Sequence, residues 1–72
     1  MHIKVNRMTV EIFSGARVKD VLRKYSAITW KQVQAGSKAV FDGHGHEVGL
    51  EGELGDGDRL VVRRAAQMET RS

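Results

Sequence analysis

The segment GELGDGDRLVV, residues 52–62, joins a turn rich in glycine and aspartate to an apolar strand. We expect Asp56 and Asp58 to accept hydrogen bonds from nearby backbone N–H groups, and Gly57 to allow the positive φ of such a turn. Residues 59–64, RLVVRR, have the composition of a strand, and the two adjacent valines indicate burial on both faces or a central place in a sheet. The segment therefore predicts a structural turn that leads into the last strand, and its spacing does not match a calcium loop.

Two further patterns precede this segment. IKV at 3–5 and MTVEI at 8–12 alternate apolar with polar residues, and the polar pair Asn6-Arg7 between them predicts a β-hairpin. The period then changes to that of a helix over 17–25, because apolar residues recur three and four positions apart. The apolar stripe of this helix consists of Val18, Val21, Leu22 and Tyr25.

The middle of the chain is open to more than one interpretation. SAITWKQVQAGS at 26–37 fits a short strand, since Ile28 and Trp30 alternate with polar neighbours, and it also fits an irregular connection in which Trp30 fills the core. KAVFD at 38–42 and HEVGL at 46–50, separated by the turn GHG, predict a second hairpin. The aromatic residues expected to anchor the packing are Phe13, Tyr25, Trp30 and Phe41.

These elements follow one another in the order ββ-α-β-β-β. A right-handed crossover through the helix covers one face of the sheet, and the central last strand then lies beside the first. The sequence therefore predicts an α+β fold in which a mixed sheet packs on one helix.

The size and composition of the chain narrow its function. A domain of 72 residues buries only about 60 % of its unfolded surface and has little room for an enclosed cleft, which argues against an enzyme. The chain has no Cys, so it offers no disulfide and no thiol nucleophile, as is usual in the cytoplasm. It also has no apolar run of membrane-spanning length. We therefore expect a cytoplasmic, non-enzymatic domain that needs no cofactor and has no membrane partner.

The charges are distributed unevenly, although the formal net charge is only +3. Residues 1–38 carry eight Lys and Arg against two Asp and Glu, and residues 39–58 carry six Asp and Glu with no Lys or Arg. Residues 59–72 are basic again, with four Arg against one Glu. A nucleic-acid binder does not normally keep such an acidic third. Separate basic and acidic surfaces favour a protein partner, and two ordinary solvated faces explain the pattern equally well.

With its elements in this order, the chain resembles the β-grasp, or ubiquitin-like, superfamily, and within it the small sulfur carriers of the ThiS and MoaD type. The resemblance rests on IKVN followed by TVEI, on SGARVKDVLRKY, on KAVFDGHGHEV, and most of all on LGDGDRLVV. It implies a β-grasp roll over residues 1–64 and a disordered C-terminal tail over 65–72. Because one fold carries many functions, the resemblance is more specific for fold than for function.

The resembling carriers end in Gly-Gly, and their terminal thiocarboxylate enters the active site of an activating adenylyltransferase or a sulfur-transfer enzyme. This chain contains no Gly-Gly: Gln67 and Met68 fall near the expected position, and the small residues Ala65 and Ala66 come slightly earlier. The resemblance therefore supports three hypotheses. The chain is a sulfur carrier in variant or diverged form, a non-catalytic protein-interaction module, or an RNA-contacting domain similar to the TGS domains.

Basic residues outside the tail give a further candidate surface. Arg23 and Lys24 on the predicted helix would join the arginines that end the last strand if both elements lay on one side of the molecule. Such a patch would suit RNA or an acidic protein surface, although each residue taken singly is more simply explained by solubility. The candidate binding residues are therefore Arg63, Arg64, Ala65, Ala66, Gln67, Met68, Arg23 and Lys24.

The pair His44 and His46 is a weak metal candidate, because His is a common metal ligand. Two ligands do not make a site, and nothing in the sequence fixes a third. Two histidines in a hairpin turn are more simply solvated turn residues. We therefore predict no metal site.

Overall fold

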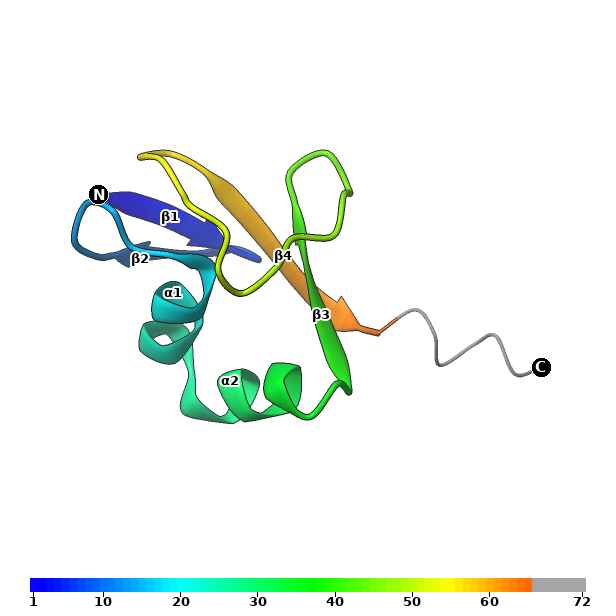
Figure 1. The fold of residues 1–72 in the computed structure, drawn as a ribbon. Helices are drawn as coiled ribbons and strands as arrows, with labels where there is room; N and C mark the ends of the chain where they lie inside the picture. Colours follow the sequence, from blue (N-terminus) through cyan, green and yellow to red (C-terminus); the bar gives the residue numbers. More distant parts are fainter. Residues whose placement is uncertain (66–72) are drawn as a thin grey trace.

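The computed structural model describes residues 1–65, which form a small α+β fold with a four-stranded mixed sheet (Figure 1). Both helices lie on the same side of this sheet. No helix in this part of the chain is long and apolar enough to cross a membrane. The elements are β1 His2–Val5, β2 Met8–Glu11, α1 Val18–Tyr25, α2 Ala27–Gln34, β3 Lys38–Asp42 and β4 Arg59–Arg64.

The strands lie side by side in the order β2-β1-β4-β3. β1 pairs antiparallel with β2 and parallel with β4, and β4 pairs antiparallel with β3. The predictions that the first two strands form a hairpin and that the last strand lies beside the first are therefore confirmed. Asn6 in the hairpin turn has a φ of 55°, and its side-chain oxygen accepts a hydrogen bond from the N–H of Val62 at 2.9 Å. The turn is thus attached to β4.

The core lies between the sheet and α1. Alternate residues of the central strands are buried there, including Ile3 and Val5 on β1 and Leu60 on β4. The predicted apolar stripe of α1 packs against them through Val18, Val21 and Leu22. Burying an aliphatic side chain of this size contributes about 1.5–3 kcal/mol, so this cluster supplies most of the driving force for folding.

Residues 27–34 form a second helix, so both the predicted strand and the predicted irregular connection are wrong. The extended residue Ser26 ends α1 and begins α2, and its hydroxyl accepts a hydrogen bond from the N–H of Thr29 at 3.2 Å. Such a cap satisfies one of the free N–H groups of the first turn. Trp30 and Val33, three residues apart, pack against the core as a helix requires. Trp30 is half-buried, so it packs against the core and does not fill it as predicted.

The predicted second hairpin forms only in part, because 46–50 is not a strand. Asp42 donates its N–H to the carbonyl of His46 at 2.8 Å, and Val48 donates to Val40 at 2.9 Å. After this short contact the chain turns away from the sheet. It pairs instead with the start of α1, where Val18 donates to the carbonyl of Gly52 at 3.0 Å. Within residues 1–65 the sheet therefore has four strands where the sequence predicts five.

The aromatic residues contribute less to the core than predicted. Phe13 is 62 % exposed, so its predicted role as an anchor is wrong. Tyr25 and Trp30 are half-buried and pack at the edge of the core, which is itself aliphatic. Phe41 is half-buried on β3.

The turn over residues 55–58 has the predicted hydrogen bonds. The Asp56 carboxylate accepts the N–H of His2 at 2.7 Å, and the Asp58 carboxylate accepts the N–H of Gly55 at 2.7 Å. Gly57 has a φ of 89° and donates its N–H to the carbonyl of His2 at 2.8 Å. The turn therefore holds the start of β1 against the start of β4, and so helps to set the parallel pairing of these two strands.

Replacing Gly57 with alanine is expected to destabilise the protein by about 1–2 kcal/mol, because a Cβ is strained at this positive φ even though it meets no atom within 4 Å. Gly49→Ala is the matched control, since Gly49 also lies in open space and has no such φ. We expect this control to leave stability unchanged or to raise it slightly. Urea unfolding curves measure both, and equal midpoints for the two variants would contradict the account of the turn.

Candidate functional site

The open face of the sheet is the face turned away from the helices. Its side chains alternate with the buried ones, so that Lys4 lies between two buried residues on β1, and Arg59, Val61 and Arg63 alternate with buried residues on β4. Strand pairing brings residues from all four strands onto this face. The open face consists of His2, Lys4, Thr9, Glu11, Ala39, Phe41, Arg59, Val61 and Arg63.

Three hydrogen-bond donors form a row across the open face. Lys4 is the register partner of Arg59 on β4 and of Thr9 on β2. Neighbouring strands lie about 4.8 Å apart, so the two cations project side by side. Like charges opposite one another on a sheet are destabilising. Neither cation forms an ion pair with a carboxylate within residues 1–65, and so the repulsion is not offset there.

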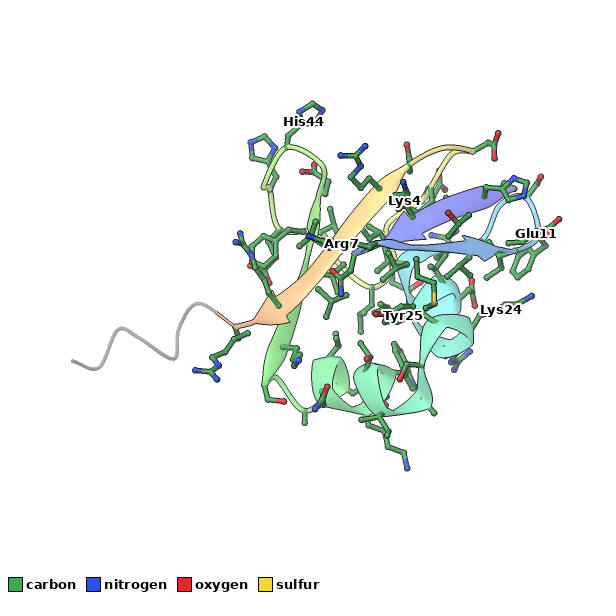
Figure 2. All side chains as sticks on the ribbon, turned by 180° about the vertical axis from the view of Figure 1, so that it is seen from behind. Lys4, Arg7, Glu11, Lys24, Tyr25 and His44 are labelled. Atoms are coloured by element: carbon green, nitrogen blue, oxygen red, sulfur yellow. The ribbon has the colours of Figure 1, made fainter. Side chains whose placement is uncertain are left out.

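Two more arginines lie near this row. Figure 2 shows Lys4 and Arg7 beside β4. The guanidinium of Arg63 lies over the ring of Phe41, with 4.4 Å between its Cζ and the ring centroid. This cation–π contact covers the aromatic ring and leaves the charge exposed. The open face is therefore basic, and its aromatic ring is already occupied.

The acidic segment 47–58 is, by contrast, partly neutralised by the beginning of α1. Lys19 Nζ donates to the Glu51 carboxylate at 2.8 Å, and Arg17 lies 3.7 Å from the carboxylate of Glu53. Arg17 also donates to the carbonyl of Glu51 at 2.8 Å. The two charge blocks seen in the sequence therefore pair with each other here. Lys4, Arg59 and Arg63 on the open face form no ion pair with a carboxylate within residues 1–65.

Replacing Lys19 with glutamine is expected to bring the pKa of Glu51 back toward its ordinary value of 4.5. The hydrogen bond and the charge of Lys19 are the main causes that hold the pKa of this carboxyl below that value. A lowered pKa in the folded state means that this contact stabilises the protein above about pH 4.5 and that the contribution is lost as pH falls through the folded-state pKa. Carbon NMR titration of the carboxyl groups measures the change.

The pKa of Asp42 provides the control for that titration. Its carboxylate accepts the N–H groups of His44 at 2.8 Å and His46 at 3.0 Å, and these backbone hydrogen bonds hold its pKa below 3.8. Lys19 takes no part in them, so Lys19→Gln should leave the titration of Asp42 unchanged. A Glu51 titration that also stays unchanged would show that the contact with Lys19 does not form in solution.

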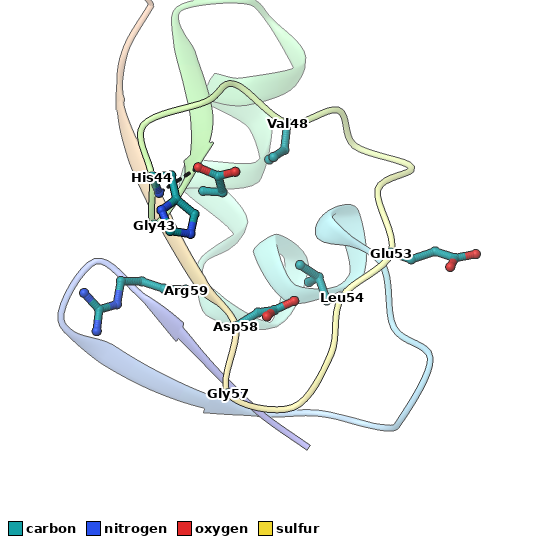
Figure 3. Close-up of a pocket in the computed structure, with 9 residues that line it drawn as sticks. Gly43, His44, Val48, Glu53, Leu54, Gly57, Asp58 and Arg59 are labelled. Atoms are coloured by element: carbon teal, nitrogen blue, oxygen red, sulfur yellow. Dashed lines mark hydrogen bonds between the residues drawn. The ribbon is translucent and has the colours of Figure 1, made fainter.

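A cleft of about 510 Å³ lies between the turn after β3 and the loop before β4 (Figure 3). Its walls carry both signs of charge, from Arg59 and from Asp42, Glu53 and Asp58, together with the imidazole of His44. The carboxylates of Asp42 and Asp58 already accept backbone N–H groups of their own turns. The cleft is therefore a polar groove whose best-placed acceptors are satisfied, and we assign it no ligand.

The candidate histidines lie in the exposed turn after β3, as predicted. His46 Nδ1 is 3.7 Å from the carboxylate of Asp42. Within residues 1–65 no group of three or more His, Asp or Glu side chains is placed to hold a metal ion. The pair thus belongs to a turn held by Asp42.

The predicted basic residues do not come together in one patch. Arg63 lies on the open face, whereas Arg23 lies on α1 over the ring of Trp30, with 5.2 Å between Cζ and the ring centroid. Figure 1 shows α1 well separated from the end of β4, so Lys24 cannot join Arg64 in one surface. The arrangement that would bring the helix and strand cations into one patch is therefore not the one observed.

The predicted tail residues fall on both sides of the last described position. Ala65 is only 2 % exposed and donates its N–H to the carbonyl of Ser37 at 3.2 Å, so the folded part includes it. Ala66, Gln67 and Met68 lie outside the described residues.

Lys4 and Arg59 are the site residues that the sequence did not reveal. Each is a single cation in an alternating strand, and only the parallel pairing of β1 with β4 places them side by side. Comparisons with models of known protein families, with curated proteins and with solved structures returned no match.

Proposed function

We propose that this chain is a β-grasp domain that works as a non-enzymatic interaction module, and that its open face binds an acidic surface of a protein partner. The mixed sheet with its central parallel pair and the helices on one side support the β-grasp assignment. The observation that supports the function is the opposed pair Lys4 and Arg59, which has no carboxylate partner within residues 1–65.

An acidic partner would remove an unfavourable repulsion between Lys4 and Arg59. Side-by-side cations on adjacent strands destabilise the free domain, and carboxylates placed between them would relieve this cost on binding. The arginine over Phe41 adds a third exposed cation to the same face. Complementary charge of this kind speeds association and selects partners more than it adds affinity.

A protein partner is favoured over RNA for a reason that also lies on this face. Single-stranded nucleic acids bind to proteins by stacking bases on exposed aromatic rings as well as by backbone charge. Phe41 is the single aromatic residue of the open face, and Arg63 already covers its ring. Charge alone therefore remains for recognition, and a protein surface rich in Asp and Glu can meet it.

The test uses two probes of equal charge, a fluorescently labelled oligoglutamate peptide and a labelled single-stranded RNA. We expect the full chain to bind the peptide at low salt and to lose affinity as ionic strength rises, because exposed charges are screened. The RNA should bind more weakly than the peptide at every salt concentration. Fluorescence anisotropy measures both, and tighter binding of the RNA would favour the RNA-contacting alternative.

The sulfur-carrier function is the second candidate, because β4 lies in the middle of the sheet and leads directly to the C-terminal residues. In this proposal an activating adenylyltransferase modifies the terminal carboxylate and a sulfur-transfer enzyme then completes the thiocarboxylate. Incubation with such an enzyme, ATP and a sulfur donor, followed by intact-mass measurement, tests it. A mass increase that corresponds to the replacement of one oxygen by one sulfur would support the sulfur-carrier function. An unchanged mass would count against this function.

A further inference from the structure

A shallow cavity of about 200 Å³ lies on the open face. Its wall is formed by His2 and Lys4 on β1, Thr9 on β2, Arg59 on β4, and Gly57 in the turn before β4. No carboxylate of residues 1–65 lines it. We call this cavity the oxyanion notch, because every side chain in its wall can donate a hydrogen bond.

The donors of the notch converge because of the strand register. Arg59, Lys4 and Thr9 occupy one row across three adjacent strands, so a guanidinium, an ammonium and a hydroxyl group surround one depression. Figure 3 shows the Arg59 side chain extending from β4 over the β1–β2 hairpin. A guanidinium binds two oxygens of an anion in a fixed fork, while an ammonium supplies a compact point charge. Together they suit an anion with several oxygens.

Two carboxylates lie beside His2, which is in the wall of the notch, and neither forms an ion pair with the row. Asp56 accepts the backbone N–H of His2 at 2.7 Å, and its carboxylate lies 3.9 Å from His2 Nδ1. Glu11 lies 4.0 Å from His2 Nε2. The permanent charges of Lys4 and Arg59 have no carboxylate partner within residues 1–65.

We propose that the oxyanion notch binds a phosphate dianion, carried by a phosphorylated segment of the acidic protein partner. The choice of partner rests on the proposed function, whereas the phosphate site rests on the notch alone. A phosphorylated side chain carries a charge between −1.5 and −2 near neutral pH and has three acceptor oxygens, which matches two cations and a hydroxyl. A carboxylate or a nucleic-acid phosphodiester carries only one negative charge.

The first experiment titrates the full chain with inorganic phosphate, phenyl phosphate and dimethyl phosphate at pH 7.5 and constant ionic strength. Two-dimensional amide NMR is expected to show saturable shifts at Lys4, Thr9 and Arg59 with the first two anions. Dimethyl phosphate, a monoanionic diester, should bind about tenfold more weakly. Equal affinity for all three anions, or the same shifts with chloride, would overturn the proposal.

Substitutions of Lys4 and Arg59 test whether these two side chains bind the phosphate. Lys4→Gln and Arg59→Gln should each weaken phosphate binding about tenfold, because each removes a charge-assisted hydrogen bond. Both side chains are exposed, so the fold should be retained, and relief of the repulsion should leave the thermal midpoint unchanged or higher. Lys31→Gln, a matched change at an exposed position of α2, should leave phosphate affinity unchanged. Wild-type affinity in both notch variants would contradict the assignment.

The phosphate site and the acidic-partner function can be disproved separately, because each predicts binding of a different probe. If the oligoglutamate peptide binds the open face and phosphate does not bind, the notch proposal is wrong and the interaction module stands. If inorganic phosphate binds the notch and the peptide does not bind, the phosphate site stands and the acidic-partner proposal is wrong. A phosphoserine peptide that binds more tightly than its unphosphorylated form supports both.

Discussion

Replacing Leu60 with alanine should cost about 2–5 kcal/mol, the range seen when a buried leucine is truncated. Leu60 is 1 % exposed and lies on the central strand β4, where it packs in the core against residues of β1 and α1. A domain of this size has a stability near the low end of the usual 5–15 kcal/mol. The variant is therefore expected to be largely or partly unfolded at 25 °C, and urea unfolding followed by far-UV circular dichroism measures the loss.

Val61→Ala is the control for this prediction, because Val61 is the next residue on the same strand and faces the open side. It is half-buried, so we expect a loss of about 1 kcal/mol. Similar losses for the two variants would mean that β4 does not present alternate faces as described. Such a result would also remove the basis for placing Arg59 and Arg63 on the open face.

The double variant Arg59→Glu, Arg63→Glu should bind the acidic peptide at least about 100-fold more weakly than the wild type. Reversal places carboxylates against the carboxylates of the probe, and such like-charge contacts cost several kcal/mol. The effect should shrink as salt is added, since both residues are exposed. Fluorescence anisotropy at several salt concentrations measures it.

The control Lys24→Glu, Lys31→Glu changes the net charge by the same amount on the helices. Both lysines are exposed, and neither lies on the open face. We expect only a small loss of affinity, because the change alters the overall field and removes no contact. If the helix variant weakens binding as much as the strand variant, the peptide responds to net charge alone and the open face has no special role. Thermal unfolding of both variants establishes that they remain folded.

The parts of the fold that sequence patterns predict are those governed by local chemistry. The 55–58 turn needs Gly57 at positive φ and is closed by Asp58 on the N–H of Gly55, so this part of its signature lies within four residues, whereas Asp56 accepts the N–H of His2 on β1. The stripe of α1 is likewise a local pattern. α2 is different, because its helix depends on the Ser26 cap and on Trp30 and Val33 meeting the core, and the apparent alternation around Ile28 conceals this.

The candidate site is less accessible from sequence, because its residues are distant along the chain. Lys4 and Arg59 become neighbours only through the parallel pairing of β1 with β4. The sequence offers Arg63 as a candidate binding residue, and the structure places it on the open face. It cannot show that Arg63 covers Phe41, or that Glu51 takes up the charge of Lys19. Charge counted along the chain therefore locates the basic blocks but does not say which cations remain unpaired.

The central claim is that the open face is the binding surface of this domain. Amide NMR of the full chain titrated with the oligoglutamate peptide tests it most directly, since each amide reports its own surroundings. We expect shifts to concentrate on β1 and β4, at Lys4, Arg59 and Arg63, and to leave α1 and α2 nearly unchanged. Shifts concentrated on α1 around Arg23 and Lys24, with the open face unaffected, would contradict the claim.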